Sequence, residues 1–208
     1  MIAVLDYGIG NLRSAEKALQ HVGADARLVT DPEVAAGATG VVLPGVGAFG
    51  ACAAALRRSG LESAARDAVG RQVPFLGICV GFQLLFEGSD EDPHETGLGL
   101  LPGHSRLLPV TERLPQMQWN IVRHVQGRSS RLLGDAGGSP LWFYFVHSYA
   151  PMMSGEAEPS VVGVCEYGGP VVAAVEQGSL FGTQFHPEKS GKSGLELLRR
   201  FASLCGPK

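Results

Sequence analysis

A cysteine between two glycines is the clearest candidate for chemistry in this chain. Residues 74–83 read Pro-Phe-Leu-Gly-Ile-Cys-Val-Gly-Phe-Gln, which places Cys79 between Gly77 and Gly81. The apolar residues before Cys79 predict a buried strand, and the apolar run 82–86 predicts a helix after it. A nucleophile at a sharp strand-to-helix turn is the nucleophile-elbow arrangement, in which the helix N-terminus stabilises a thiolate and backbone N–H groups hold an oxyanion. The same short pattern also fits an inert cysteine at a buried strand end.

A histidine and a glutamate two residues apart supply the other half of a catalytic site. His186 and Glu188 flank Pro187, and residues two apart in an extended segment project to the same side. The carboxylate can then orient the imidazole and stabilise its charged form. With Cys79 the set becomes Cys–His–Glu, which suits acyl transfer through a thiolate. A surface salt bridge is the alternative for the pair, and His147, which has no acid two residues on, is the rival base.

Two glycine-containing loops follow predicted strands. Residues 45–50, Gly-Val-Gly-Ala-Phe-Gly, come after the apolar run 40–44, at the strand end where open α/β sheets bind ligands. Gly8 and Gly10 after the first strand invite a dinucleotide-binding interpretation, but Arg13 stands where the third glycine belongs.

Composition restricts the class of protein. The chain has 208 residues, 45% hydrophobic and 18% charged, with a net charge of −3, so we expect a single domain over residues 1–208. The absence of a basic cluster argues against nucleic-acid binding. No apolar run has the length of a membrane span, and the N-terminus is typical of a first strand rather than a signal peptide, which favours a cytoplasmic protein. The four cysteines have neither zinc-ligand spacing nor a predicted disulfide, so we expect no metal.

The order of predicted elements favours an α/β fold with a mainly parallel sheet covered by helices on both faces. The expected strands of the first half are residues 2–6, 26–29, 40–44 and 73–78, with helices at 12–22 and over an Ala- and Leu-rich stretch after 50 interrupted at 59–60. The second half predicts a solvated acidic loop at 88–95, short irregular strands over 98–125, a connector at 127–140, a strand at 141–146, a loop at 154–159, antiparallel strands at 161–166, 171–176 and 179–185, and a helix at 190–204.

Gly77–Gln83 together with Gln184–Glu188 resembles the class I, or triad, glutamine amidotransferases. The stretches 6–14, 43–50, 143–149 and 181–190 narrow the resemblance to the glutaminase subunits of imidazole glycerol phosphate synthase, from histidine biosynthesis. The resemblance implies a flavodoxin-like three-layer α/β/α class I glutamine amidotransferase fold, with a mostly parallel central sheet and an added antiparallel β portion.

The resemblance also implies a mechanism and a set of site residues. Cys79 would attack glutamine to form a thioester, His186 would protonate the departing ammonia and activate water, and Glu188 would orient His186. The implied oxyanion hole comprises Val46, Gly47 and Val80, and the implied substrate-binding residues are Gly45, Gln83, Ser148 and Tyr149. No cofactor is implied.

A partner follows from the same resemblance. Ammonia would pass to a separate (β/α)₈-barrel cyclase subunit, which makes imidazole glycerol phosphate and AICAR from PRFAR, and the isolated chain would hydrolyse glutamine poorly. Trp119 and Tyr144 match family interface positions. Asn11 and Lys189 match positions that couple the two active sites, although these two also suit ordinary surface polar residues. The family usually reads Pro-His-Met-Gly-Trp-Asn where residues 115–120 read Pro-Gln-Met-Gln-Trp-Asn, which changes the loop near the interface.

Two other functions fit the sequence less well. A glutaminase that serves another synthase, such as the pyridoxal phosphate enzyme, would share the elbow and the His-Pro-Glu. A non-enzymatic interaction module would not need Cys79, His186 and Glu188 together.

Overall fold

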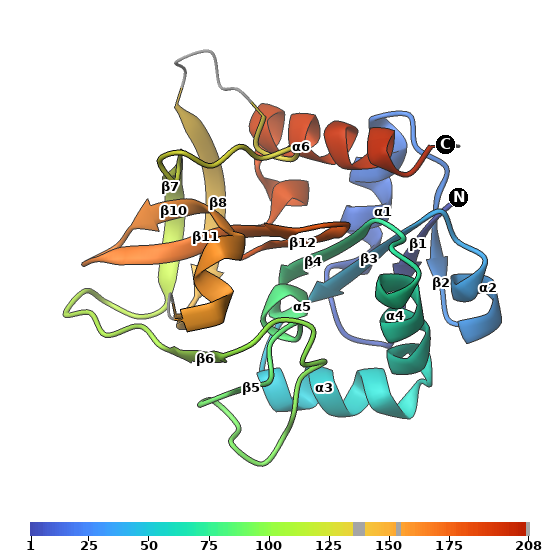
Figure 1. Cartoon of the computed structure of the whole chain (residues 1–208), viewed down its shortest axis with the longest axis horizontal. Coiled ribbons are helices and arrows are strands. Elements are labelled where there is room, and N and C mark those ends of the chain that lie inside the picture. Colours follow the sequence, from blue (N-terminus) through green and yellow to red (C-terminus); the bar gives the residue numbers. More distant parts are fainter. Residues whose placement is uncertain (135–139, 153–154, 207–208) are drawn as a thin grey trace.

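The computed structural model describes residues 1–134, 140–152 and 155–206, which form a mixed sheet with helices on both sides (Figure 1). The first half contains β1 (Ile2–Leu5), α1 (Leu12–His21), β2 (Ala26–Val29), α2 (Pro32–Ala36), β3 (Gly40–Gly45), α3 (Phe49–Arg58), α4 (Leu61–Gly70), β4 (Phe75–Cys79) and α5 (Val80–Gln83). The second half contains β5 (Gly88–Ser89), β6 (His104–Leu107), β7 (Gln116–His124), β8 (Leu141–His147), β9 (Tyr149–Pro151), the 3₁₀ helix η1 (Gly155–Ser160), β10 (Val161–Glu166), β11 (Pro170–Gln177), β12 (Leu180–Thr183), the 3₁₀ helix η2 (Pro187–Lys189) and α6 (Gly191–Leu204).

The central sheet changes from parallel to antiparallel at β12. Its strand order is β2-β1-β3-β4-β12-β11-β10-β7-β8, with parallel pairing from β2 to β12 and antiparallel pairing beyond. The expected α/β fold is confirmed, although the antiparallel part provides as many strand pairings as the parallel part. In β12, Thr183 pairs with Ile78 of β4, so the carboxyl ends of these two strands lie side by side. The residues that follow each strand are therefore brought to one edge of the sheet.

Helices cover both faces of the parallel part. Figure 1 places α1 and α6 on one side of the sheet and α3 and α4 on the other. Each helix turns an apolar stripe inward, as Ala15 and Leu19 of α1 and Leu198 and Phe201 of α6 show. Strands β1, β3 and β4 are buried along their whole length, as expected for strands covered on both faces.

Several boundaries differ from the sequence-based expectation. Helix α2 was not expected; Asp31 accepts a hydrogen bond from the Glu33 N–H at its start, and Pro32 suits the first helical position. Helix α5 covers Val80–Gln83, so the helix expected over 82–86 is present but begins and ends earlier. The short irregular strands expected within 98–125 are replaced in part by the nine-residue strand β7, which pairs along its length with β8.

The expected loops are also modified. The loop expected at 154–159 is a 3₁₀ helix over residues 155–160. Residues 135–139 of the expected connector and residue 154 of that loop lie outside the described residues. The acidic segment 88–95 begins with the short strand β5, in which Ser89 is buried. This segment is therefore attached to the fold rather than fully solvated.

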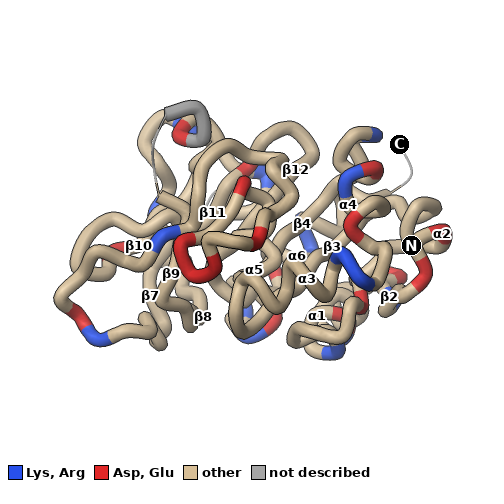
Figure 2. The backbone as a smooth tube through the Cα atoms, turned by 90° about the horizontal axis from the view of Figure 1, so that it is seen from below, with Lys and Arg blue, Asp and Glu red and all other residues tan. Residues whose placement is uncertain are grey.

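The distribution of surface charge and the state of the cysteines can be compared with the sequence. Lysine and arginine alternate with aspartate and glutamate along the tube in Figure 2, without a continuous basic stripe over the part that is described. All four cysteines are buried and free of disulfides. Among the described residues, no group of histidine, cysteine, aspartate and glutamate could hold a metal ion, and no helix could cross a membrane.

A very close glycine contact lies at the elbow and gives a stability prediction. A Cβ at Gly81 would lie 1.9 Å from the Leu43 carbonyl oxygen, which is backbone and cannot move aside cheaply. We expect Gly81→Ala to lower the free energy of unfolding by about 3 kcal/mol or to prevent folding, because overpacking of this kind costs up to that amount. Urea denaturation measures the change.

Gly70 is the matched control for this substitution. It is exposed at the end of α4, and a Cβ there would meet no heavy atom within 4 Å in the described part of the chain. Gly70→Ala should therefore leave stability unchanged or raise it by up to about 1 kcal/mol. Equal stability of the two variants would contradict the close-approach argument.

Candidate active site

Cys79 occupies a sharp turn that only closely packed glycines allow. It is the last residue of β4 and directly precedes α5, with φ 56° and ψ −112°, a backbone conformation that residues other than glycine rarely adopt. A Cβ at Gly77 would lie 2.7 Å from the Gly81 carbonyl oxygen, and one at Gly45 would lie 2.5 Å from the Gly81 nitrogen. Strand end, elbow and glycine loop thus touch through their backbones. This arrangement presents the sulfur at the end of the strand, as the elbow motif predicts.

His186 and Glu188 form a buried ion pair beside the elbow. His186 Nδ1 lies 2.8 Å from Glu188 Oε1, and both side chains are 1% exposed. Asn11 Nδ2 donates to the same carboxylate oxygen at 3.0 Å. The backbone N–H of His186 donates to the Tyr144 carbonyl of β8 at 3.0 Å, which fixes the start of η2. The imidazole is therefore held by the Glu188 carboxylate, which is itself held by the Asn11 amide.

Charge on the pair is favoured on both sides. Burial lowers the pKa of His186, but the neighbouring Cys79 sulfur and the Glu188 carboxylate outweigh it and raise the pKa to about 10. Burial raises the pKa of Glu188, but His186 and Asn11 together lower it by more. The pKa of Glu188 therefore falls below its ordinary value. An imidazolium next to a carboxylate is the form that this geometry stabilises.

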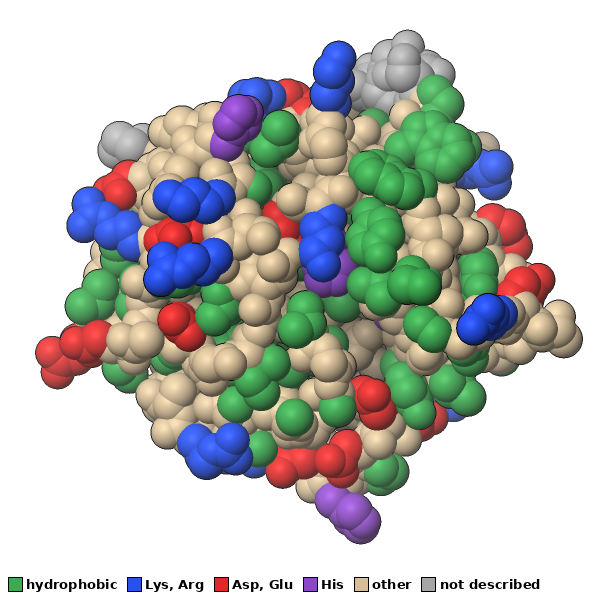
Figure 3. Space-filling view, turned by 180° about the vertical axis from the view of Figure 1, so that it is seen from behind, with side chains coloured by type: hydrophobic (Ala, Val, Ile, Leu, Met, Phe, Trp, Pro, Cys, Tyr) green, Lys and Arg blue, Asp and Glu red, His purple; other side chains and the backbone are tan. Residues whose placement is uncertain are grey.

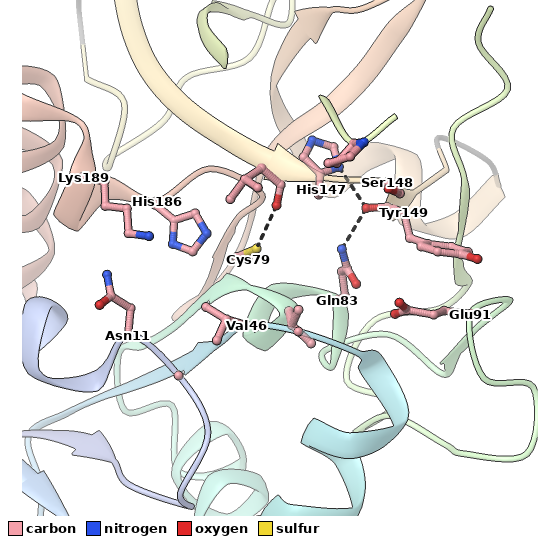
Figure 4. Close-up of a pocket in the computed structure, with 15 residues that line it drawn as sticks. Asn11, Val46, Cys79, Gln83, Glu91, His147, Ser148, Tyr149, His186 and Lys189 are labelled. Carbon is pink, nitrogen blue, oxygen red and sulfur yellow. Dashed lines mark hydrogen bonds between the residues drawn. The ribbon is translucent and has the colours of Figure 1, made fainter. Parts of the chain in front are cut away.

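The remaining ring nitrogen of His186 faces the cysteine. In Figure 4 the ring edge of His186 points toward the Cys79 sulfur, with Lys189 and Asn11 on its other side. His186 Nε2 is buried and has no hydrogen-bond partner among the described residues. Catalytic hydrogen bonds are often long before substrate binds and tighten in the complex. The three side chains thus have the order Cys–His–Glu that transfers an acyl group through a thiolate.

A pocket of about 540 Å³ opens beside the sulfur. Its lining includes most of the residues expected from the sequence: Asn11, Val46, Gly47, Cys79, Val80, Gln83, Ser148, Tyr149, His186 and Lys189. Gly45 lies under the elbow instead, Glu188 lies behind His186, and Trp119 and Tyr144 lie on the adjoining sheet face.

The known family with this geometry also matches in sequence. The model of the family "Glutamine amidotransferase class-I" matches residues 3–204. The chain belongs to the class I glutamine amidotransferases.

Relatives and solved structures agree with this assignment. "Imidazole glycerol phosphate synthase subunit HisH" of Salinibacter ruber is 46% identical and that of Methanothermobacter thermautotrophicus is 44% identical; the alignments cover 98% of this chain and 94% and 98% of the relatives. "Crystal structure of glutamine amidotransferase" has a TM-score of 0.76 at 23% identity over 99% of both chains. "Structure of PurLQS from Thermotoga maritima" has a TM-score of 0.72 at 20% identity over 97% of both chains. These two likenesses show the shared fold.

The glycine loop of this amidotransferase is held by buried side chains. The Cys52 thiol donates to the Val46 carbonyl at 3.2 Å, and the Tyr7 hydroxyl donates to the Pro44 carbonyl at 2.6 Å. Gly47 has φ +82°, which a glycine adopts without strain. Since C=O and N–H of one peptide point in opposite directions, the Gly47 N–H points away from Cys52.

His147, the rival base, has a different environment. Its Nδ1 lies 2.9 Å from the Tyr149 carbonyl oxygen rather than from a carboxylate. Burial lowers the pKa of His147 to about 4, against the opposing effect of the Tyr149 carbonyl and with a further lowering by His186. A neutral ring whose Nδ1 proton is bound to a carbonyl differs from the carboxylate-backed His186. The geometry therefore favours His186 as the base.

The sequence analysis assigned no role in the site to Glu91 or to Gln184. Glu91 lines the pocket and accepts the Phe49 N–H at 2.9 Å, although the sequence around it predicts only a solvated loop. Gln184 Nε2 lies 3.8 Å from the Cys79 sulfur. Gln184 could have been found from its spacing, because it precedes His186 by two residues in an extended segment. Glu91 carries no such signal.

An apolar sheet face adjoins the pocket. In the β7–β8 ladder, Trp119 pairs with Tyr144 and Met117 pairs with Val146, so their side chains share one face. Trp119 is 49% exposed and Met117 64% exposed. Lys189 Nζ lies 6.0 Å from the Tyr144 ring centroid, which links this face to the pocket. Figure 3 shows hydrophobic side chains gathered at one side of the molecule.

The ion pair predicts the titration of His186. In Glu188→Gln the imidazolium loses its carboxylate, so we expect the NMR titration midpoint of His186 to move downward from about 10. Because the raised pKa belongs to the folded state, the associated stability is complete below the unfolded value of about 6.5 and is lost as pH rises toward 10.

Glu176→Gln, which alters an ion pair with Arg131 elsewhere on the sheet, is the control and should leave that midpoint unchanged. A midpoint that is the same in parent and Glu188→Gln would contradict the role of the carboxylate.

Proposed function

We propose that this chain hydrolyses glutamine to glutamate and ammonia as the glutaminase subunit of imidazole glycerol phosphate synthase. The observation that carries the proposal is the Cys–His–Glu set at a glycine elbow, in a chain 44–46% identical over nearly its whole length to proteins named as this subunit. The whole of residues 1–208 acts as one amidotransferase domain. Four free, buried cysteines suit a reducing compartment, which supports a cytoplasmic location.

The chemistry divides into two acyl transfers. The Cys79 thiolate attacks the carboxamide carbon of glutamine, and the oxyanion is held by the N–H groups of Val80 and of the loop at Val46 and Gly47. His186 gives its proton to the departing nitrogen, which leaves as ammonia, and a thioester remains. Water then attacks the thioester carbonyl while its proton passes to His186, and glutamate and the thiolate are released.

Charge and polarity of the pocket suit the rest of the substrate. Glu91 is solvent-exposed at the pocket edge and can attract the α-ammonium group of glutamine. Ser148 and Tyr149 line the same pocket and offer a hydroxyl and backbone groups. Gln83 contacts the Tyr149 carbonyl at 2.8 Å, so it acts on the substrate through the position of that strand.

We infer that a (β/α)₈-barrel cyclase docks on the apolar sheet face. Such barrels carry their active sites at the carboxyl ends of their strands, so the chain would dock near that mouth and deliver ammonia to the chemistry that forms imidazole glycerol phosphate and AICAR from PRFAR. Trp119 and Tyr144 are aromatic anchors of the kind found at interface centres. Asn11 contacts the Glu188 carboxylate and Lys189 lines the pocket, which gives both a path from the interface to the triad.

Cys79→Ala tests the reaction itself. We expect glutamine hydrolysis to be lost in the complex with the cyclase, because alanine has no thiolate with which to form the thioester. The parent chain alone should turn over slowly and faster with the cyclase, since the Cys–His contact and the loop N–H groups must be aligned first. Ammonia release, assayed with and without the cyclase, measures both effects.

Two results would oppose this function. Persistent hydrolysis by Cys79→Ala would remove Cys79 from the mechanism, and equal turnover with and without the partner would remove the need for alignment. Ammonia release that rises with the barrel of pyridoxal phosphate synthase instead would assign the chain to that synthase.

Lys189 and Trp119 should affect the complex in different ways. Trp119→Ala should weaken binding of the cyclase by about 2 kcal/mol, as loss of a central aromatic anchor does. Lys189→Ala should lower coupled turnover while changing the dissociation constant by less than about threefold, because an exposed lysine contributes little to affinity. Binding titrations beside a coupled assay separate the two effects.

Lys192→Ala, an exposed lysine at the start of α6, is the control and should change neither quantity. A parallel fall in affinity and turnover for Lys189→Ala would make Lys189 an ordinary contact.

A further inference from the structure

A buried glutamine amide contacts the sulfur of Cys79. Gln184 is fully buried and its Nε2 lies 3.8 Å from Sγ. Gln184 directly follows β12 and precedes His186 by two residues. The amide and the imidazole therefore approach the sulfur from the same segment. An amide N–H is a hydrogen-bond donor, and a donor close to a buried sulfur favours its charged form.

The orientation of this amide is determined by its neighbours. The Tyr149 carbonyl can only accept, so the Gln83 atom 2.8 Å from it is the NH₂ group. The same nitrogen lies 3.2 Å from Gln184, which must therefore present its oxygen to Gln83. The NH₂ group of Gln184 is left to face Cys79. The Tyr149 carbonyl, the Gln83 amide and the Gln184 amide thus form a chain of hydrogen bonds that ends at the Cys79 sulfur.

The other neighbours of the sulfur show why this donor matters. The Val146 carbonyl oxygen also lies near the Cys79 sulfur, at 4.0 Å. A thiol can donate to that carbonyl, whereas a thiolate is repelled by it. His186 and Gln184 are side chains near the sulfur that favour the thiolate. The amide opposes the carbonyl without carrying a charge of its own.

We propose that Gln184 is a further catalytic residue, whose amide donates to the Cys79 thiolate and holds it in place, with Gln83 and the Tyr149 carbonyl fixing the direction of that amide. The proposal rests on Cys79 being the nucleophile of the proposed function. It assigns Gln83 an indirect positioning role as well as its place in the pocket. Movement of the Ser148–Tyr149 segment on substrate binding would then change the position of the Gln184 amide next to the sulfur.

Alkylation of Cys79 tests the proposal without glutamine or a partner. Iodoacetamide reacts with the thiolate, so its rate at Cys79, followed by peptide mass spectrometry across pH 5.5 to 10, reports the thiolate fraction. In Gln184→Met, which keeps the length and removes the donor, the midpoint should rise by about one unit and the rate at pH 7 should fall about tenfold. In Gln83→Met the Gln184 amide is free to turn, so a smaller shift in the same direction is expected.

Gln177→Met is the matched control, since Gln177 is exposed at the end of β11 where the hairpin turns toward β12. It should reproduce the parent profile, and circular dichroism checks that each variant is folded. A Gln184→Met profile that superimposes on the parent overturns the proposal; if that variant does not fold, an unshifted Gln83→Met profile overturns it. A parent chain that lacks glutaminase activity with the cyclase would oppose the proposed function and leave the alkylation result standing.

Discussion

The parallel pairing of β4 with β12 is the constraint on which the site depends. The two strands are about 100 residues apart in sequence, since Cys79 and Gln184 are separated by 105 positions. Their in-register pairing brings both carboxyl ends to one edge of the sheet. Cys79 ends one strand, and His186 follows the other. The positions of Cys79 and His186 relative to each other are therefore set by the pairing of these two strands.

Burial gives the ion pair its strength and its cost. Removing His186 and Glu188 from water is unfavourable for each charge, and their mutual attraction in the interior offsets this only with good geometry and further hydrogen bonds. The 2.8 Å contact and the amide of Asn11 supply both. Asn11 belongs to the turn after β1, so a residue near the first strand stabilises the charge on Glu188, which follows the last strand. The carboxylate is thereby kept ionised behind a ring that has to carry a proton.

Local chemistry was readable from the sequence, whereas long-range pairing was not. The elbow at Cys79 and the spacing of His186 and Glu188 were predicted because each depends on residues close in the chain. The length of β7 was missed because its partner β8 lies beyond the connector and its alternation is interrupted by Gln118, Trp119 and Asn120. The role of Glu91 was missed because its partner Phe49 is distant in sequence. Gln184 contacts the distant Cys79, but its spacing of two residues before His186 was a local signal for it.

Strand β8 joins the proposed docking face to the chemistry by a short physical path. The Tyr144 carbonyl accepts the His186 N–H, while the Tyr144 ring lies 6.3 Å from that of Trp119. Two residues on, the Val146 carbonyl faces the Cys79 sulfur. A partner that presses on the aromatic side chains therefore acts on a strand whose backbone touches both the base and the nucleophile. Small shifts of β8 therefore change the positions of the hydrogen-bond donors and acceptors around the Cys79 sulfur.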